Sequence, residues 1–403
     1  MPERTIHSPP HGSPLRIAMM GSRGVPALYG GSETAIEEIG WRLAQRGHRV
    51  VVYCRRHNSR TGARLYRGME RIVLPSLHTK SLDTPSHTLL SITHALAFRK
   101  ADLIHFHGVG NALFLPLLKA RGVKSVVTVD GPDWERPKWG RFARFTLRRS
   151  AALATSLADG LIIDNQVAIR YFEEHFGVRG EYIPYGAYVE HEPQSDYLEK
   201  VGLEPGSYVL FVGRLIPDKG VHLLVRAFEG VKTDRKLAIV GDNPYFPDYI
   251  RQLKSTPDRR IVFLGYVFGG PYRQLCSHAY LYAHPLLVDG TSPDLLQAMG
   301  FGNAVLGADL PQVVDVLGES GFYFRTGDAD DLRRQLQHLL DHPEEVEAGR
   351  KRSAQRVSAL FNWDQVTDQH EALYRRAIAG RGRPLRRTTE GRRERQGAPI
   401  ESR

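Results

Sequence analysis

Short apolar runs alternate with amphipathic helical stretches from residue 16 to about residue 345. Each run is rich in Val, Ile and Leu and is followed by positions that repeat with helical period. This alternation predicts parallel sheets whose strands are joined by crossover helices. The expected strands are Arg16–Met20, Arg49–Tyr53, Leu103–His107, Ser125–Val129, Gly160–Asp164, Tyr208–Val212, Lys236–Val240, Arg260–Leu264, Ala279–Ala283 and Ala304–Gly307.

The series of strands restarts after a polar stretch, Tyr185–Ser207, which we interpret as a linker. We therefore expect two doubly wound, Rossmann-like α/β domains, at residues 15–190 and 191–362. A final helix is expected at 363–380. Residues 1–14 and 381–403 are polar, and we expect both ends to be disordered.

The charge of the chain is concentrated at one end. The formal net charge is +11, and residues 380–403 hold eight Arg against three Glu. Such a tail can rest on anionic lipid or nucleic acid, or only keep the protein in solution, which is the interpretation we favour. No specific nucleic-acid partner is expected.

Targeting signals are missing from the sequence. No apolar run reaches the ~18 residues that span a bilayer, and the first residues lack an apolar secretory core. We therefore expect a cytoplasmic protein. The two cysteines, Cys54 and Cys276, lie far apart and are expected to be reduced, buried thiols.

The first candidate site is the loop after the strand Tyr208–Val212. It begins at Gly213, and Arg214 and Lys219 follow five residues apart. An Arg can hold two oxygens of a diphosphate while a Lys supplies a point charge. The alternative is an ordinary solvated basic loop.

A second candidate site follows about seventy residues later, at Asp289–Gly300. A strand leads into small residues, Ser292 is a suitable N-cap, and Pro293 fits the first helical position. Backbone N–H groups at such a helix N-terminus bind anions. Two anion sites in one half of the chain favour a bound nucleotide phosphate.

These two segments resemble a known family. Gly-Arg-Leu-Ile-Pro-Asp-Lys-Gly at 213–220, with Leu-Leu-Gln-Ala-Met-Gly at 295–300, is similar to the donor half of the retaining family 4 glycosyltransferases. The resemblance implies the GT-B fold, in which two Rossmann-like domains face a central cleft and the last helix crosses back to the first domain. It also implies that no metal or other cofactor is needed.

The resemblance assigns roles in the donor half. Gly213, Arg214 and Lys219 would hold the diphosphate together with Gly290, Thr291 and Ser292. Tyr266 and Val267 would contact the base. The family's Glu-x7-Glu pair is Asp289 and Gln297 here, so Asp289 would lie near the transferred sugar and the neutral Gln297 would bond the ribose.

The first half opens on a glycine-rich loop, residues 21–31. It matches neither a dinucleotide fingerprint nor a Walker loop. Gly30 and Gly31 lie near a helix N-terminus, where Thr34 and Glu37 predict a capping box. The loop is longer than most connections, which favours donor binding over a plain turn.

Asp130 stands just past a strand, where open parallel sheets bind ligands. Trp134, Arg136 and Trp139 follow it and suit sugar stacking and hydroxyl recognition, although aromatic core anchors would explain the same residues. With the glycine-rich loop, this stretch is similar to a bacterial subgroup that contains capsule and exopolysaccharide rhamnosyltransferases. Many members of the family have His where Asp130 stands, so we expect Asp130 to act at the reacting sugar.

Two further features of the first half remain open. His105 and His107 share one face of a strand, but no third ligand is placed by the sequence, so His107 is expected to line the cleft near Asp130 rather than bind a metal. The stretch 139–153 mixes Arg with aromatic residues, which fits a helix on anionic lipid or one packed on its own domain.

Our interpretation is a retaining glycosyltransferase that uses a nucleotide-diphosphate sugar, with Asp130, His107 and Asp289 as catalytic candidates. The expected sugar is a deoxyhexose such as rhamnose, and the expected acceptor is a saccharide or a lipid-linked saccharide at the inner face of the plasma membrane. The alternatives are a nucleotide-sugar epimerase, a phosphorylase, or a nucleotide-sugar-binding protein without turnover.

Overall fold

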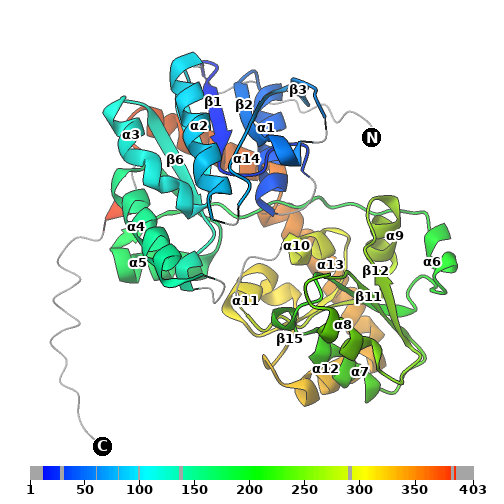
Figure 1. Cartoon of the computed structure of the whole chain (residues 1–403). Helices are drawn as coiled ribbons and strands as arrows, with labels where there is room; N and C mark the ends of the chain where they lie inside the picture. The colour runs from blue at the N-terminus through cyan, green and yellow to red at the C-terminus, as the bar shows by residue number, and fades with distance from the viewer. Residues whose placement is uncertain are drawn as a thin grey trace, which may run out of the picture. The chain divides into compact units, whose positions relative to one another are not determined.

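The computed structural model describes residues 12–27, 31–59, 61–79, 81–98, 100–135, 139–288, 293–382 and 385–386. The chain divides into two compact units (Figure 1). The first unit contains Met1–Pro184 and Asp364–Arg403, and the second contains Tyr185–Trp363.

The first unit is built on an eight-stranded sheet in the order β3-β4-β2-β1-β5-β6-β7-β9, which is parallel except for the β3–β4 pair. Helices flank this sheet (Figure 1). The strands of the whole first unit are β1 Arg16–Met20, β2 Arg49–Arg55, β3 Leu65–Tyr66, β4 Met69–Leu74, β5 Leu103–His107, β6 Lys124–Val129, β7 Gly160–Ile163, β8 Val178–Arg179, β9 Glu181–Tyr182 and β16 Leu385–Arg386. Of these, β8 and β16 pair with each other outside the eight-stranded sheet. The helices are α1 Gly31–Gln45, α2 Asp83–Phe98, α3 Leu115–Ala120, α4 Arg141–Leu157, α5 Gln166–Phe176 and α14 Trp363–Ile378, with 3-10 turns at Arg56–Asn58, Val109–Phe114 and Asp133–Glu135.

The second unit is built on a six-stranded parallel sheet in the order β12-β11-β10-β13-β14-β15. Its strands are β10 Tyr208–Val212, β11 Lys236–Val240, β12 Ile261–Gly265, β13 Leu281–His284, β14 Val305–Ala308 and β15 Phe322–Phe324. Its helices are α6 Asp196–Lys200, α7 Val221–Glu229, α8 Pro247–Lys254, α9 Gly270–His278, α10 Pro293–Gly300, α11 Pro311–Leu317, α12 Ala329–Asp341 and α13 Pro343–Leu360, with 3-10 turns at Pro217–Lys219 and Gly318–Ser320.

Each sheet is buried by apolar side chains on both faces, which is why its strands read as continuous apolar runs. The last helix, α14, packs on the first unit. Tyr374 and the Nδ1 atom of His105 on β5 share a hydrogen bond of 2.7 Å, and the Arg46 guanidinium lies 3.1 Å from the Glu371 carboxylate. The doubly wound fold expected from the strand alternation is therefore confirmed.

The expected strands agree with the structure to within two residues at each end, and β1, β5, β10 and β11 agree at both ends. The strands β3, β4, β8, β9, β15 and β16 were missed, and β16 lies in the tail that we expected to be disordered. The capping box is wrong, because α1 begins at Gly31 and Thr34 lies inside its first turn. Glu37 instead accepts a hydrogen bond from the Ala27 backbone N–H at 2.7 Å.

The stretch Tyr185–Ser207, interpreted as a linker, belongs to the second unit. It contains the short helix α6, whose Leu198 is buried in the apolar core around Tyr208 and Leu210. Polar composition suggested a connection here, but Ala187, Leu198 and Leu203 are buried in this core and attach the segment to the sheet.

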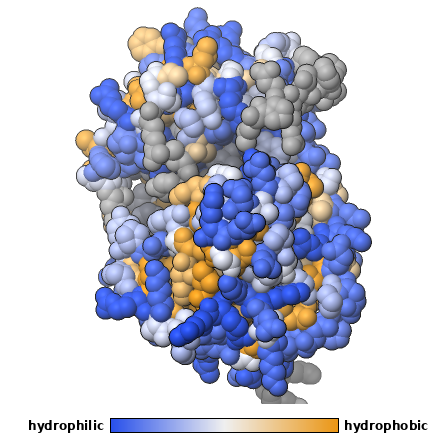
Figure 2. All heavy atoms as spheres, turned by 90° about the vertical axis from the view of Figure 1, so that its right-hand side faces the viewer, coloured by the Kyte–Doolittle hydropathy of each residue, from blue (hydrophilic) through white to orange (hydrophobic). Residues whose placement is uncertain are grey.

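The surface shown in Figure 2 is mostly hydrophilic, with hydrophobic residues exposed in patches. Among the described residues, no helix is long and apolar enough to cross a membrane. Both cysteines are free and buried, as expected.

Candidate functional site

The loop after β10 is held at the carboxyl edge of the second sheet by close backbone contacts. The Gly213 N–H donates to the Val240 carbonyl at the end of β11, at 3.0 Å. A Cβ at Gly241 would lie 1.9 Å from the Gly213 carbonyl oxygen, so only glycine allows this approach. Arg214 comes next and is exposed, and no ion pair joins it to any described residue. Its guanidinium therefore remains available to an anion.

Lys219 lies beside the first turn of α10. Its Nζ atom is 3.5 Å from the Asp294 carboxylate, at the second position of that helix. The loop is fixed there by two backbone features: Leu287 donates its N–H to the Asp218 carbonyl at 2.9 Å, and Gly220, with a φ of +67°, packs against the Pro285 carbonyl. The two segments that the sequence marked as anion sites are therefore neighbours in space.

His284, at the end of β13, was not predicted as a site residue. It is buried, and neither ring nitrogen has a hydrogen-bond partner among the described residues. Burial, reinforced by the positive charge of Lys219, lowers its pKa to about 3, so the ring is neutral at pH 7. Its place at the end of the strand next to β10 is the signal that could have found it.

Gln297 lies on the exposed face of α10, where its side-chain oxygen accepts a hydrogen bond from the Tyr272 hydroxyl at 3.0 Å. Burial raises the pKa of Tyr272 well above its ordinary value, so this hydroxyl stays a donor. Asp289, Gly290, Thr291 and Ser292, which were predicted to contact the donor, lie outside the described residues.

Tyr266 and Val267 follow β12 at the same edge of the second sheet. The Tyr266 hydroxyl donates to the Asp242 carbonyl at 3.0 Å, which ties the loop after β12 to the loop after β11. The rings of Tyr266 and Phe268 stack with centroids 5.9 Å apart, and both are exposed. An exposed aromatic pair beside a basic loop suits the flat ring of a base.

In the first unit, His107 and Asp130 lie at the carboxyl ends of the neighbouring strands β5 and β6. His107 is buried, its Nε2 atom has no hydrogen-bond partner among the described residues, and burial lowers its pKa to about 3. Asp130 is half-buried, and its backbone carbonyl accepts a hydrogen bond from the Asn165 amide at 3.0 Å. The structure therefore brings both predicted residues to one edge of the sheet.

His105 cannot share a metal ion with His107 as arranged here. Its Nδ1 atom bonds to Tyr374 and its Nε2 atom bonds to Thr128, each at 2.7 Å. Both ring nitrogens are thus occupied. Burial lowers the pKa of His105 well below its usual range, which keeps the ring neutral within the core.

Trp134 is a core residue rather than the exposed acceptor contact that we expected. Only 6% of it is exposed, and its ring packs against Tyr171, Phe172 and Phe176 with centroids about 6 Å apart. Trp139 is half-buried just before α4, and Gly31 is the first residue of α1. Arg136 and Gly30 lie outside the described residues.

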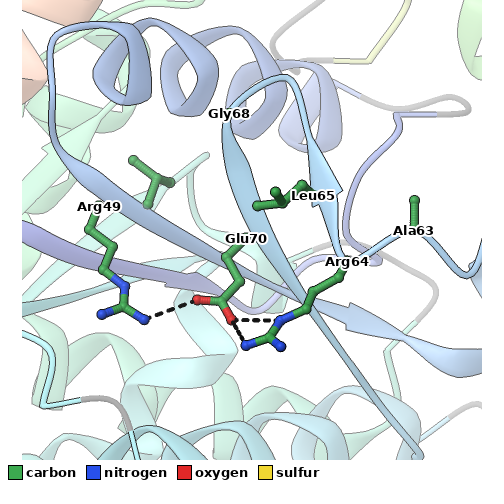
Figure 3. A pocket seen from close by; sticks show the side chains of 7 residues that line it. Arg49, Ala63, Arg64, Leu65, Gly68 and Glu70 are labelled. Carbon is green, nitrogen blue, oxygen red and sulfur yellow. Dashed lines mark hydrogen bonds and ion pairs between the residues drawn. The ribbon is translucent and has the colours of Figure 1, made fainter.

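A hollow of about 680 Å³ lies elsewhere in the first unit (Figure 3). Two of its lining residues, Arg49 and Glu70, stand at the amino ends of β2 and β4, opposite the edge that holds His107 and Asp130. Glu70 bridges Arg49 at 3.4 Å and Arg64 at 3.1 Å, as Figure 3 shows. Because this hollow lies at the edge of the sheet opposite His107 and Asp130, we do not assign it to the site.

Comparisons with known proteins place both halves of the chain in a family. A model described as "Glycosyltransferase Family 4" matches residues 29–190, and one described as "Glycosyl transferases group 1" matches residues 206–342. Together they cover about three quarters of the chain. The chain is 23% identical over 393 residues to a phosphatidylinositol N-acetylglucosaminyltransferase subunit of Arabidopsis thaliana, covering 92% of this chain and 84% of that protein.

Solved structures show the same fold. Sucrose-phosphate synthase from Thermosynechococcus elongatus matches with a TM-score of 0.77 and 20% identity, over 90% of this chain and 99% of that one. HepE from Anabaena, in complex with UDP-glucose, matches with a TM-score of 0.71 and 18% identity, over 89% of this chain and 99% of the HepE chain. The fold and the family matches thus define a GT-B glycosyltransferase. Within that class, the chain belongs to the group 1 and family 4 glycosyltransferases.

Proposed function

We propose that this enzyme transfers a hexose from a nucleotide-diphosphate sugar to a saccharide or lipid-linked saccharide, with retention of configuration. The observation that carries the proposal is the meeting of two cationic groups at one edge of the second sheet. Arg214 is exposed without an ion-pair partner among the described residues, and Lys219 lies at the first turn of α10. A diphosphate is the ligand that two such cations and a helix N-terminus bind best.

Each described group has a chemical task in this proposal. Arg214 grips diphosphate oxygens in pairs, and Lys219 adds a point charge as negative charge builds on the leaving diphosphate. Gln297, held by Tyr272, offers its amide N–H to a ribose hydroxyl. Tyr266 and Val267 contact the base. The predicted roles of Asp289 at the sugar and of Gly290, Thr291 and Ser292 at the diphosphate stay part of the proposal.

In the first unit, Asp130 and His107 are proposed to act at the acceptor and the transferred sugar. Because its pKa is about 3, His107 is neutral and serves as a hydrogen-bond partner rather than a cation. An ionised Asp130 orients a hydroxyl or stabilises positive charge that develops at the anomeric carbon. No metal or other cofactor is proposed for the transfer.

The sugar is the finer part of the proposal. The motifs of the first half favour rhamnose, the Arabidopsis relative is named for N-acetylglucosamine, and the HepE structure holds UDP-glucose. A thermal-shift screen of UDP, GDP and dTDP sugars decides among them. A ligand at about 100 times its dissociation constant adds about 2.7 kcal/mol of stability.

The diphosphate site is tested by Arg214→Ala and Lys219→Ala, with Arg226→Ala as the matched control. Arg226 is an exposed arginine on α7 of the same unit and lies outside the proposed site. Isothermal titration with the nucleoside diphosphate should show a loss of roughly 1.5–3 kcal/mol of binding free energy for each site variant. The control should bind normally. Equal affinity in all three variants would refute the site.

We also propose that α4 holds the first unit on an anionic membrane, where a lipid-linked acceptor lies. Phe142 and Phe145 are 83% and 59% exposed, and the Arg149 guanidinium lies 5.3 Å above the Phe145 ring. The opposite face of the helix, around Ala151 and Ala154, is buried in the core. Apolar rings flanked by arginine suit the headgroup region of a bilayer.

Co-sedimentation with vesicles tests the membrane proposal. The enzyme should bind vesicles that contain phosphatidylglycerol and should not bind vesicles of phosphatidylcholine alone. A Phe142→Ala, Phe145→Ala double variant should bind weakly while nucleotide binding is unchanged. Equal sedimentation of the variant and the wild type would contradict the role of α4.

A further inference from the structure

Three metal-ligand side chains meet at the corner between α12 and α13 in the second unit. They are His338 in the last turn of α12, His342 at the junction, and Glu345 in the first turn of α13. One ligand atom from each lies within 4.8 Å of the other two. The Nε2 atom of His338 is 3.1 Å from the nearer carboxylate oxygen of Glu345.

We propose that these three residues bind one divalent transition-metal ion, with Zn²⁺ as the preferred ion. Two imidazoles and one carboxylate form a known zinc ligand set, with water at the fourth position. Zinc bonds of about 2.0–2.1 Å in tetrahedral geometry place ligand atoms roughly 3.4 Å apart. The His338 Nε2 atom and the Glu345 carboxylate oxygen are already close to this spacing, at 3.1 Å.

The tautomer of His342 is already set for a metal. Its Nδ1 atom donates a hydrogen bond to the His338 backbone carbonyl at 2.8 Å. The lone pair of neutral His342 is therefore on Nε2. A backbone carbonyl that holds the other ring nitrogen is the usual support of a metal-binding histidine.

The backbone that carries the cluster is anchored, and the local charge favours a cation. The Tyr280 hydroxyl donates to the Leu339 carbonyl at 2.7 Å, and Leu339 itself is buried in the core. Residues 335–349 contain four acidic side chains, at positions 341, 344, 345 and 347, and neither Lys nor Arg. Glu347 is paired with Arg350 and Lys351, which border the segment, so Asp341, Glu344 and Glu345 supply the negative charge near the cluster.

The cluster is remote from the proposed donor site. Tyr280 immediately precedes β13, whereas His284 ends that strand, so the metal corner lies at the amino edge of the sheet and the diphosphate loop at the carboxyl edge. A metal there clamps α12 to α13 and stabilises the unit without taking part in transfer. We did not predict a metal site at this corner from the sequence.

The test uses the full chain, purified without a polyhistidine tag and stripped of metal with a chelator. Titration with ZnCl₂ should show saturable binding of one equivalent and a raised melting temperature, and MgCl₂ should show neither, because imidazole sites prefer transition metals. His338→Ala, His342→Ala and Glu345→Gln should each weaken zinc binding at least tenfold. Co²⁺ in place of Zn²⁺ should give the visible absorption bands of a tetrahedral site.

His175→Ala is the matched control. His175 is an exposed histidine whose Nδ1 atom, like that of the half-buried His342, donates to the carbonyl four residues earlier, here Tyr171 at 3.0 Å. The His175→Ala variant should bind zinc with the same affinity as the wild type. Absence of saturable zinc binding in the wild type overturns the proposal, as does zinc affinity that is unchanged in all three ligand variants. His338 and Glu345 are 45% and 43% exposed, so their variants should fold, which circular dichroism checks.

Discussion

Gly220→Ala tests whether the diphosphate loop is held as the structure shows. Gly220 has a φ of +67°, and a Cβ built there would lie 1.8 Å from the Pro285 carbonyl oxygen. Since real Cβ atoms stay at least 3.0 Å from such an atom, the loop must move by about 1.2 Å. That movement separates Lys219 from the start of α10.

The two costs of this substitution can be separated. Ala at a positive φ costs roughly 1–2 kcal/mol, and the clash with Pro285 adds to that. Gly206→Ala is the matched control, because Gly206 has a φ of +72° and no atom within 4 Å of its Cβ position. It should lose only the backbone term, so the difference between the two variants measures the clash.

Two measurements decide the outcome. Urea unfolding should show Gly220→Ala less stable than Gly206→Ala, and kcat/KM for the donor should fall on the order of 100-fold in Gly220→Ala, as expected for a misplacement of about 1 Å. The control should keep wild-type kinetics. If both variants lose the same stability and Gly220→Ala keeps its kcat/KM, then the loop does not pack against Pro285 and the reasoning fails.

Gln297→Glu should retain or tighten nucleotide binding in calorimetry, because a carboxylate makes stronger hydrogen bonds to ribose hydroxyls than an amide does; a more than tenfold loss would remove Gln297 from the ribose site. Asp130→Asn should lower kcat and kcat/KM together by about 100-fold or more while donor affinity is kept, and wild-type turnover would leave Asp130 as a structural residue. Acid should destabilise the fold, because burial lowers the pKa of His107 to about 3 and that of His370 to about 4, so the unfolded chain binds more protons as the pH falls from about 6.5 towards these values. Each of these two histidines should lower the free energy of unfolding by about 2 kcal/mol at pH 5 relative to pH 8. In urea unfolding, the His370→Leu variant should lack the contribution of His370 to this pH dependence. An unchanged pH dependence in the variant would contradict the lowered pKa of His370.

Much of the fold could be read from the sequence because burial on both faces of a parallel sheet leaves an unmistakable apolar run. The strands β1, β5, β10 and β11 were predicted at both ends for this reason. The strand β15, Phe322–Phe324, was missed because it is three residues long and lies at the edge of its sheet. Short edge strands carry too little periodicity to be separated from a turn.

The positions of candidate site residues could be predicted where the residues lie close together in the sequence. Arg214 and Lys219 stand five residues apart on a loop after a strand, and together with the helix start near Ser292 they suggested a diphosphate. The position of His107 and Asp130 at the carboxyl ends of neighbouring strands is confirmed, and their role at the reacting sugar stays a prediction. Trp134 was misplaced, because a tryptophan in a polar stretch looks the same in sequence whether its ring faces a ligand or the core.

Local sequence was enough to predict the class of fold, the two basic positions on the loop after β10 and the strand ends that carry His107 and Asp130. These depend on periodicity and short spacings, which act between neighbours in the chain. The hydrogen bond between His105 and Tyr374, 269 residues apart, and the packing of Gly220 against Pro285 could be seen only in the folded structure. The folded structure was also needed to show that His284 is buried, and that burial and the charge of Lys219 keep its ring neutral. Such contacts depend on how the strands are ordered in the sheet, and no local pattern of residues encodes that order.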